Sequence, residues 1–465
     1  MAIMTTLAYT TSETYSNHVN RLIEVYENAI NAISTNSCGP ISHIESVLIH
    51  SGRAGHYFGD DRSIPFQAYG HFSHWLPVNQ PDQFLHIRAG EKPTYFQIIP
   101  SDFWYEQSID LPDWCAEQFQ LVTLTAANQL PRHLQGKGIA YLGEQPGLGD
   151  SLGISADMLN PQPLLHYLDF NRAYKNEYEL EQLRAANKLA MTGHSAAREC
   201  FLKGGNEFQI HMAYLSACEI LENECPYTNI VALDEKSAIL HYQHKRRGSR
   251  ADSRVLLIDA GCRVNGYGSD VTRTSVRPNV NSLFQQLLIK MEQLEKDLVG
   301  LVKPRMDYTE LHSYTLRTIA ELLVDLEICS GNATELLERE IPQLFMPHGV
   351  GHLLGVQVHD VGGHQSDQNG AILPPPPHSP ALRNTRELRE SMVFTIEPGF
   401  YFIPLLLEPE RNGSRAELFN WSLIDELYSC GGIRVEDNIC VTNTGAENLT
   451  RQFEVGSQID LRKRN

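Results

Sequence analysis

Residues 256–274 read LLIDAGCRVNGYGSDVTRT, and this stretch is the most informative part of the chain about the fold. An apolar run occupies residues 254–259 and ends on the carboxylate of Asp259, as a buried β-strand would. Asn265 and Gly266 follow, and an Asn-Gly pair between two strand-like runs is a strong signal for a two-residue hairpin turn. The stretch therefore predicts a β-hairpin with a carboxylate at the end of its first strand.

A second carboxylate lies in the predicted return strand. If the turn falls at the Asn-Gly pair, Asp259 pairs with Thr272, and the alternation of side chains places Asp270 on the same face as Asp259. Two like charges so close are usually tolerated only when a proton or a metal ion neutralises them. One cation could reach both aspartates, although two solvated aspartates on a hairpin would give the same pattern.

Three histidines gather in a glycine-rich stretch. Residues 345–363 read FMPHGVGHLLGVQVHDVGG and contain His348, His352 and His359 within twelve residues. Glycine lets the backbone approach another group closely, and histidine serves as a metal ligand or an acid–base group. The Gly-x-Gly part lacks the full spacing of a dinucleotide-binding loop. We expect at least one of these histidines to be a ligand or a catalytic group.

Two further carboxylates stand next to predicted strands. The apolar run 392–396 leads into Glu397, and a charge at the buried end of a strand needs a partner, which a cation would supply. In residues 431–439, GGIRVEDNI, strand alternation places Arg434 and Glu436 on one face. Glu436 could therefore be a metal ligand, or it could form an internal ion pair with Arg434.

Four carboxylates, Asp259, Asp270, Glu397 and Glu436, thus form a candidate ligand set together with one of the three histidines. Such an oxygen-rich set suits Mn²⁺ and is poorly matched to a metal that prefers thiolates. Five ligands suffice for two ions if some carboxylates bridge, and a two-metal centre can make hydroxide from water and polarise a carbonyl, as amide hydrolysis requires. A serine or cysteine triad has less support, because the chain has no Gly-x-Ser-x-Gly elbow and no cysteine near the histidines.

Composition limits the classes of function. The 465 residues include 56 acidic and 38 basic ones, for a formal charge of -18, which disfavours binding to nucleic acid. The N-terminus has neither a basic start nor an apolar run, and no stretch of about 18 apolar residues occurs. The nine cysteines include no Cys-x-x-Cys pair, so we expect reduced thiols in a cytoplasmic protein that does not bind membranes.

The chain is long enough for two domains. Short apolar runs at residues 46–49, 95–99, 119–124 and 139–142 alternate with possible helices and indicate an N-terminal α/β domain. Asn176 and Glu179 are spaced as a helix capping box. Further on, helical patterns at 284–291 and 316–323 are interleaved with strands, and Pro374–Pro377 indicates an exposed loop.

At these motifs the sequence resembles the pita-bread metallopeptidases, and within them the bacterial Xaa-Pro dipeptidases and their organophosphorus acid anhydrolase relatives. The resemblance covers nearly the whole chain and is carried by residues 256–274, by 345–363, by LRNTRELRESMVFTIEPGFYFI at 382–403 and by GGIRVEDNI. It implies the fold class α/β, with a small N-terminal α/β domain over residues 1–165 and a C-terminal pita-bread α+β domain over residues 166–465.

The resemblance also implies how the metal ions are held. Asp259 would chelate one ion, His352 and Glu397 would serve the other, and Asp270 and Glu436 would bridge the two. The implied cofactor is a pair of divalent ions per chain, with Mn²⁺ as the expected metal.

Roles for other residues follow from the same resemblance. Glu397 would be the general base, and His241 and His359 would steady the scissile carbonyl or the tetrahedral intermediate. Arg383 would receive the free carboxylate of a dipeptide, and Tyr227 would line the small substrate pocket. Without the resemblance, Tyr227 would be taken for a core residue and Arg383 for a surface charge. Thr228, where the family pattern has glycine, puts the shape of this pocket in doubt.

The expected function is hydrolysis of dipeptides with a C-terminal proline, and the same hydroxide could also attack organophosphates. The closest alternative is an Xaa-Pro aminopeptidase acting on longer peptides, which shares every metal ligand. A metal-free binding module, as some pita-bread proteins are, would not need the complete ligand set. The resemblance further implies a homodimer, in which Trp104 could close the partner's active site.

Overall fold

The computed structural model describes residues 12–36, 40–104, 106, 108–109, 111–134 and 136–454. The extreme N-terminus and Cys38, on which part of the expected location and cysteine state rests, lie outside these residues. The chain divides into two compact units. The first comprises residues 1–182 with 265–267 and 367–371, and the second comprises 183–264, 268–366 and 372–465.

The first unit is built on a five-stranded mixed sheet with the strand order β4-β3-β2-β1-β5. Its strands are β1 (Ser46–His50), β2 (Phe84–Arg88), β3 (Thr94–Ile98), β4 (Gln120–Leu124) and β5 (Ile139–Leu142). The central pairs are antiparallel, and β4 and β5 at the two edges pair in parallel with their neighbours. Four of these strands coincide with predicted apolar runs, whereas β2 was not predicted because its FLHIR sequence interrupts the apolar pattern with His and Arg.

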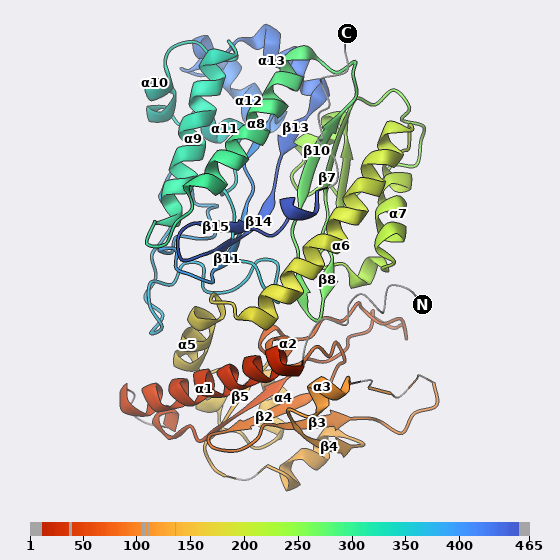
Figure 1. Cartoon of the computed structure of the whole chain (residues 1–465), viewed down its shortest axis with the longest axis vertical. Helices are drawn as coiled ribbons and strands as arrows, with labels where there is room; N and C mark the ends of the chain where they lie inside the picture. Colours follow the sequence, from red (N-terminus) through yellow and green to blue (C-terminus); the bar gives the residue numbers. More distant parts are fainter. Residues whose placement is uncertain are drawn as a thin grey trace. The chain divides into compact units, whose positions relative to one another are not determined.

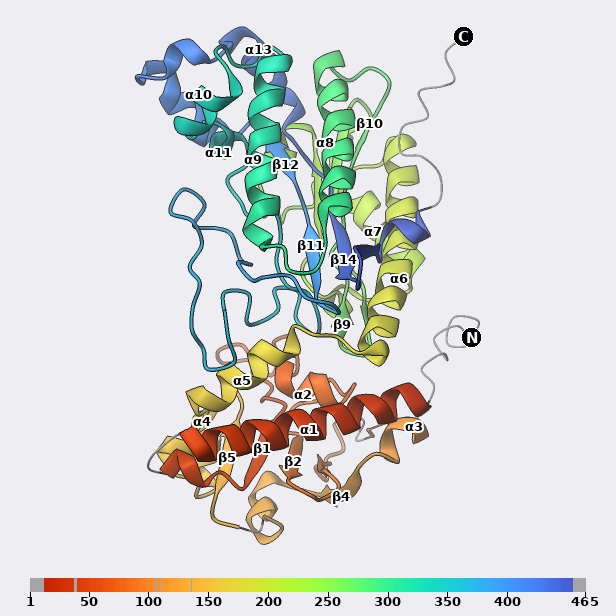
Figure 2. The ribbon, with the colours of Figure 1, turned by 60° about the vertical axis from the view of Figure 1, so that its left-hand side comes forward.

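The helices of this unit are α1 (Ser12–Asn36), α2 (Gly70–Trp75), α3 (Asp113–Ala116), α4 (Pro146–Ser151) and α5 (Gln162–Arg172). The long helix α1 runs alongside α5 (Figures 1 and 2). Strands and helices alternate along the chain, so the unit is of the predicted α/β type.

Helix α6 (Glu177–Leu202) begins where the sequence predicts a capping box. The Asn176 side-chain oxygen accepts a hydrogen bond from the Glu179 backbone N–H at 3.2 Å, and Glu179 Oε2 accepts one from the Asn176 N–H at 3.0 Å. Each bond satisfies a backbone donor that the first turn of a helix leaves unpaired. The predicted start of this helix is therefore confirmed, and the division between the two units falls within it, after Gln182.

The second unit combines antiparallel strand pairs with long helices. Its helices are the C-terminal part of α6, α7 (Glu207–Cys218), α8 (Ser282–Leu301), α9 (Tyr308–Asp325), α10 (Ala333–Glu338), α11 (Pro342–Phe345), α12 (Pro404–Leu407) and α13 (Trp421–Leu427). Its strands are β6 (Ile230–Leu233), β7 (Val255–Asp259), β8 (Arg263–Val264), β9 (Tyr267–Gly268, shared with the first unit), β10 (Thr272–Val276), β11 (Val393–Ile396), β12 (Gly399–Tyr401), β13 (Gly432–Arg434), β14 (Asp437–Val441) and β15 (Ala446–Asn448).

These strands form small sheets with the orders β10-β7-β6, β11-β14-β15, β12-β13 and β8-β9. An isolated bridge between Thr272 and Glu436 joins the first residue of β10 to the residue before β14. Figures 1 and 2 show α6 and α7 on one side of the strands and α8 and α9 on the other. The ends of the strands therefore lie between the two pairs of helices.

Strand β7 illustrates how burial sets the direction of one site residue. Leu256 and Ile258 belong to the hydrophobic cluster that also contains residues of α6 and α7. Leu257 belongs to a different cluster, with Tyr401. Because side chains alternate along a strand, Asp259 lies on the same face as Leu257, away from these two helices.

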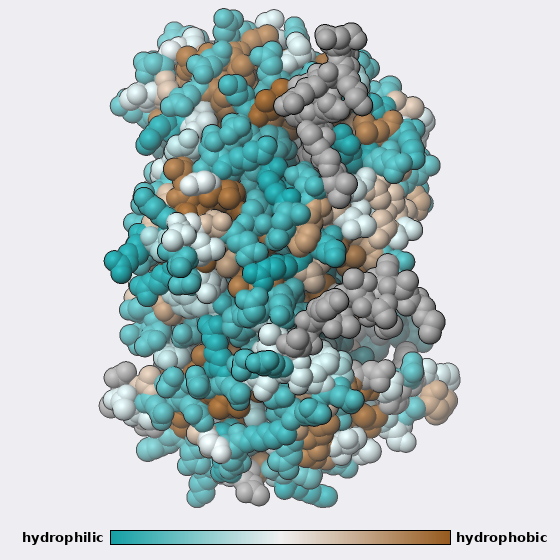
Figure 3. Space-filling model, viewed as in Figure 1, coloured by the Kyte–Doolittle hydropathy of each residue, from teal (hydrophilic) through white to brown (hydrophobic). Residues whose placement is uncertain are grey.

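The surface drawn in Figure 3 is mostly hydrophilic. On the face drawn in Figure 3, hydrophilic side chains predominate and hydrophobic ones form small scattered groups. The four prolines at Pro374–Pro377 belong to no helix or strand, as predicted, and are exposed or half-buried. Among the residues that the structure describes, no helix has the length and apolar character needed to cross a membrane.

Candidate metal centre

The two aspartates of the predicted hairpin lie on one face, as expected. Asp259 is the last residue of β7 and pairs with Thr272 of β10, which is the predicted register. Asn265 and Gly266 have φ values of 47° and 92°, and positive φ at both central residues is what a type I′ hairpin turn requires. Asp270 stands two residues before Thr272, and its side chain is buried like that of Asp259.

His352 meets the second aspartate from a loop between α11 and β11. Its Nε2 lies 3.3 Å from Asp270 Oδ2 and 3.6 Å from Glu397 Oε1. Its Nδ1 donates to the carbonyl oxygen of Leu353 at 3.0 Å, which leaves Nε2 directed at the carboxylates. A metal-ligating histidine commonly binds a backbone carbonyl through its other nitrogen in this way. His352, Asp270 and Glu436 each offer a ligand atom within 4.8 Å of the others.

Close backbone contact holds the histidine loop against β11. The N–H of His352 donates to Thr395 Oγ1 at 3.1 Å, and the N–H of Thr395 donates to the carbonyl of His352 at 2.9 Å. Gly351 has φ +153°, and a Cβ there would stand 2.1 Å from the carbonyl oxygen of Thr395. Only glycine fits this position, and the glycine-rich motif thereby sets His352 beside Glu397, the residue that follows β11.

Arg434 forms its ion pair with Asp259 rather than with Glu436. Its Nη2 lies 2.6 Å from Asp259 Oδ2, and its Nη1 donates to the Tyr401 hydroxyl at 2.9 Å. The other oxygen of Asp259 is buried without a hydrogen-bond partner among the described residues. A buried carboxylate oxygen left without a donor fits a position where a cation binds.

Glu436 turns its carboxylate toward the same site. Thr272 Oγ1 donates to Glu436 Oε2 at 2.6 Å. This contact follows from the bridge between the two residues, which brings β10 and the start of β14 together. Arg434 therefore pairs with Asp259 and not with Glu436, whose carboxylate accepts from Thr272.

The electrostatics of the cluster favour a bound cation. Burial raises the pKa of Asp259 and raises that of Glu436 well above its usual range, with a further rise from neighbouring carboxylates. Burial also raises the pKa of Glu397, to about 7. Asp270 shifts the other way: burial raises its pKa, but the hydrogen bond and charge of His352, with Tyr227 and His359, together outweigh burial and lower it. Four carboxylates this close resist joint ionisation, and divalent cations would remove that penalty.

A cavity of about 280 Å³ opens on the cluster, and its lining includes all five predicted ligands and also His241, His348, His359 and Arg383. The rings of His352 and His359 meet edge-on, with centroids 4.4 Å apart. Burial, together with the charges of His352 and Arg383, lowers the pKa of His359 to about 4. His359 is therefore a neutral hydrogen-bond donor at neutral pH.

Arg383 reaches the cavity without a carboxylate partner in the described part of the chain. Glu387, the simplest candidate for such a partner, pairs with Arg389 at 3.3 Å. A cation in the wall of a small cavity, with no internal counter-charge, is suited to bind a carboxylate from a ligand.

Tyr227 and Trp104 are not among the residues that line the cavity. The Tyr227 hydroxyl is buried, and burial together with Asp259 and Asp270 raises its pKa well above the usual range. This places Tyr227 beside the aspartates, although it is not among the residues that line the cavity. Trp104 belongs to the first unit and is 76% exposed.

Several site residues had no role assigned from the sequence. His348 lines the cavity, its Nδ1 donates to the Gly349 carbonyl at 2.7 Å, and its Nε2 accepts from the Tyr401 hydroxyl at 3.0 Å. Burial, and then Arg434, lower the pKa of His348 to about 3. The Pro-His-Gly motif marked His348 as a candidate, but its partner Tyr401 is 53 residues away along the chain.

A second group of possible ligands lies in the first unit, formed by His18, His74 and Glu179. His18 Nε2 donates to the carbonyl of His74, and its Nδ1 accepts from the Asn176 side chain, both at 2.7 Å. Both nitrogens of His18 are thus engaged, and Glu179 is part of the capping box of α6. This group therefore secures the start of α6 and is a poor metal site.

Two family models cover most of the chain. Residues 13–170 match the model of the Xaa-Pro dipeptidase N-terminal domain, and residues 181–443 match that of metallopeptidase family M24. The second match contains every residue of the cavity and all five predicted ligands.

Relatives with similar sequences extend over nearly the whole chain. The Xaa-Pro dipeptidase of Pseudoalteromonas atlantica is 39% identical over 442 residues, which cover 94% of this chain and 99% of that protein. The Xaa-Pro dipeptidase of Shewanella pealeana is 40% identical over 442 residues, with the same coverage of both chains.

Solved structures show the same fold at lower identity. Aminopeptidase P from Escherichia coli, with the inhibitor Pro-Leu, has a TM-score of 0.71 and 22% identity, covering 94% of this chain and 96% of that one. The aminopeptidase PepP of Pseudomonas aeruginosa has a TM-score of 0.71 and 20% identity, with the same coverage. These likenesses, with the family matches, confirm the predicted small N-terminal α/β domain and C-terminal pita-bread α+β domain.

Proposed function

Since the chain belongs to metallopeptidase family M24 and is a metal-dependent hydrolase, we propose that it is an Xaa-Pro dipeptidase, which cleaves the bond before a C-terminal proline. The observation that carries this proposal is the cavity that combines the carboxylate cluster with the unpaired cation of Arg383. The relatives that share 39% and 40% identity are Xaa-Pro dipeptidases, which supports the same substrate class.

We infer that Asp259, Asp270, His352, Glu397 and Glu436 hold two divalent ions per chain, with Asp270 and Glu436 shared between them. The oxygen-rich set supports Mn²⁺ as the metal. The fit rests on the buried oxygen of Asp259 that lacks a donor and on the raised pKa values of three of the carboxylates. When bound, the ions activate a water molecule for attack and polarise the scissile carbonyl.

The protein side chains supply the proton transfer and the hydrogen bonds. Glu397, which lies beside His352 in the cavity wall, takes the proton of the attacking water on a carboxylate oxygen and can pass it to the departing proline nitrogen. His241 and His359, both in the cavity wall, donate hydrogen bonds to the oxygen of the scissile carbonyl as negative charge develops on it.

Arg383 selects the length of the substrate in this proposal. A dipeptide carries its free carboxylate one residue beyond the scissile bond, where a longer peptide has a neutral amide. The planar guanidinium can hold that carboxylate through two hydrogen bonds. Tyr227 lies close to the two aspartates but is not among the residues that line the cavity, so its place in the wall of the small substrate pocket stays a prediction. Attack on organophosphates belongs to the same proposal, because the activated water can add to phosphorus as well as to carbon.

The remaining expectations stand as parts of the proposal. They are a cytoplasmic homodimer, closure of the partner's site by Trp104, and a functional domain boundary between residues 165 and 166. A native-mass measurement would test the dimer.

The experiment that tests the substrate class compares Leu-Pro with Leu-Pro-amide and Leu-Pro-Gly on metal-loaded protein. We expect the dipeptide to be cleaved far faster than the amide and the tripeptide. The Arg383→Ala variant should raise KM for Leu-Pro at least about tenfold, as loss of a charge-assisted bond implies, and should leave cleavage of the amide nearly unchanged.

Arg389→Ala is the matched control, because Arg389 is an exposed arginine that pairs with Glu387 and does not line the cavity. It should behave like the natural protein. Equal rates on Leu-Pro and on its amide would reject the dipeptidase and favour the aminopeptidase.

A further inference from the structure

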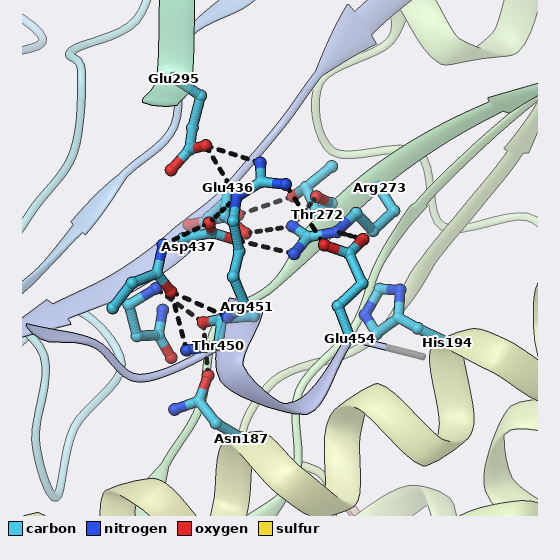
Figure 4. A network of polar contacts seen from close by, with 12 residues as sticks. Asn187, His194, Thr272, Arg273, Glu295, Glu436, Asp437, Thr450, Arg451 and Glu454 are labelled. Atoms are coloured by element: carbon cyan, nitrogen blue, oxygen red, sulfur yellow. Dashed lines mark hydrogen bonds and ion pairs between the residues drawn. The ribbon is translucent and has the colours of Figure 1, made fainter. Parts of the chain in front are cut away.

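A buried ionic network surrounds Asp437, the residue next to the proposed ligand Glu436 (Figure 4). Its centre is Asp437, the residue after Glu436, which is fully buried. Two guanidinium groups hold its carboxylate: Arg273 Nη2 lies 2.7 Å from Oδ1, and Arg451 Nε lies 2.6 Å from Oδ2. Arg273 belongs to β10, whereas Arg451 begins a short 3-10 helix (Arg451–Phe453) after β15.

The network fixes the main chain at Glu436. Arg273 Nη1 donates to the Glu436 carbonyl oxygen at 2.8 Å. The neighbouring Thr272 donates to the Glu436 carboxylate at 2.6 Å. Strand β10 thus contacts Glu436 twice, with Arg273 on its backbone and Thr272 on its side chain. Asp437 in turn forms an ion pair with Arg273.

A second arm of the network reaches Asp270. Thr450 Oγ1 accepts from the Asn438 backbone N–H at 2.9 Å and donates to Asn187 Oδ1 at 2.7 Å. The side chain of Asn438 in turn bonds both backbone groups of Asp270, accepting from its N–H at 3.0 Å and donating to its carbonyl oxygen. Thr450 therefore contacts Asn438, which bonds the backbone of Asp270. Arg451 contacts Asp437, which pairs with the Arg273 that bonds the backbone of Glu436. Asp270 and Glu436 are the two carboxylates expected to bridge the ions.

We propose that Thr450 and Arg451, in the C-terminal turn, are positioning residues for the metal centre: they set the geometry of Glu436 and Asp270 without touching substrate or metal. This inference rests on the proposed ligand set. If it is correct, Thr450 and Arg451 affect the affinity for metal although they lie outside the motifs that contain the ligands.

The chemistry of the network supports positioning over simple stabilisation. Taking charges out of water is costly, and apolar residues of similar volume often stabilise a core as well as a buried ion pair does. The hydrogen bonds of the network, from Arg273 Nη1 to the Glu436 carbonyl oxygen and between the Asn438 side chain and the Asp270 backbone, each fix an angle and a distance, which apolar packing does not. Partners that orient metal ligands from behind typically affect metal affinity or activity by about 10–100-fold.

The test measures metal affinity on folded, metal-free protein. Mn²⁺ is titrated against a competing chelator for the natural protein and for Arg451→Met and Thr450→Val. Both variants should bind Mn²⁺ more weakly, by about 10–100-fold for Arg451→Met. With saturating Mn²⁺, kcat on Leu-Pro should fall while KM stays unchanged, because neither residue lines the cavity.

Arg184→Met serves as the matched control. Arg184 makes a two-bond pair with Glu447 in β15, at 2.9 and 2.8 Å, and so ties the same C-terminal segment to α6. These two bonds to Glu447 involve neither Asp437 nor Asn438. Its loss should lower the melting temperature while leaving the Mn²⁺ dissociation constant within about twofold, since changes away from the ligands are not transmitted to them.

A natural Mn²⁺ affinity in folded Arg451→Met and Thr450→Val would overturn the inference, whatever their melting temperatures. If Arg451→Met does not fold, the nearly isosteric Thr450→Val decides alone, and a natural Mn²⁺ affinity in folded Thr450→Val would then overturn the inference. If the natural protein itself binds no Mn²⁺, the proposed ligand set fails, and that outcome differs from one confined to the variants.

Discussion

Glu397 is the residue on which the chemistry depends most. It sits beside His352 at the end of β11, and burial raises its pKa to about 7. In a Glu397→Gln variant the amide oxygen can still coordinate a metal ion, but the side chain cannot accept a proton from the attacking water. We expect kcat on Leu-Pro to fall by at least about 10²-fold, while elemental analysis still finds metal. Full turnover with full metal would move the role of base to another group.

The histidines of the cavity wall should act on rate. His241→Ala and His359→Ala each remove a donor to the developing oxyanion, and such a loss usually costs about 2.7–4 kcal/mol in the barrier, or roughly 10²–10³ in kcat. His244→Ala is the control for the first, because His244 is exposed and does not line the cavity. Unchanged kcat in both site variants would contradict the assigned roles.

At the scale of elements, the segment that carries His241 is held by one buried carboxylate at the start of α7. Glu207 accepts hydrogen bonds from the Leu233 N–H, the Tyr242 hydroxyl and both the backbone and side chain of Arg246. Its four bonds span residues on both sides of His241, and so restrict where that imidazole can lie.

Glu207→Ala should therefore loosen this segment and leave buried donors unpaired. We expect the free energy of unfolding to fall by about 1–3 kcal/mol and kcat to fall as well, measured by denaturant unfolding and by Leu-Pro hydrolysis. Glu235→Ala removes an exposed partner of the same Arg246, at 3.0 Å, and should change stability by less than about 1 kcal/mol. Equal effects from the two variants would argue against the clamp.

The elements differ in how far the sequence predicts them. The β7–β10 hairpin and the start of α6 are specified by neighbours in the chain, through an Asn-Gly turn and a capping box. Their register and bounds were therefore predictable. Strand β2 was not, because its His and Arg are buried or half-buried by tertiary packing that no local pattern shows.

The same distinction holds within the site. The four carboxylates could be named from motifs, but the choice of His352 among three histidines and the grouping of the five ligands relied on a family resemblance. The pairing of Arg434 with Asp259 joins residues 175 positions apart, and the contact of Arg451 with Asp437 depends on the path of the last strands. Such contacts are set by the assembled fold, so local periodicity carries no signal for them.

At the scale of the whole molecule, stability should depend on pH through buried neutral histidines. His312 on α9 is buried, its Nε2 lies 2.8 Å from Ser379 Oγ, and burial lowers its pKa to about 4. The unfolded chain binds a proton below its ordinary pKa of about 6.5, whereas the folded protein does so only near 4. The stabilisation is therefore present above pH 6.5 and is lost as the pH falls toward 4.

The free energy of unfolding of the natural protein should rise with pH across this window. In His312→Gln, which cannot titrate, the slope should be smaller by up to about 1.4 kcal/mol per pH unit. Urea unfolding at several pH values, compared between the two proteins, checks this. Identical slopes would show that His312 takes up its proton equally in both states.

If the five-residue cluster is a two-metal hydrolytic site, metal content and activity measured on one preparation should change together. Elemental analysis of the dialysed natural protein should find about two divalent ions per chain; a strong chelator should abolish Leu-Pro hydrolysis, and Mn²⁺ should restore it. Asp270→Asn, which weakens a carboxylate expected to serve both ions, should lose metal and activity together. Full hydrolysis of Leu-Pro by metal-free protein would contradict the account.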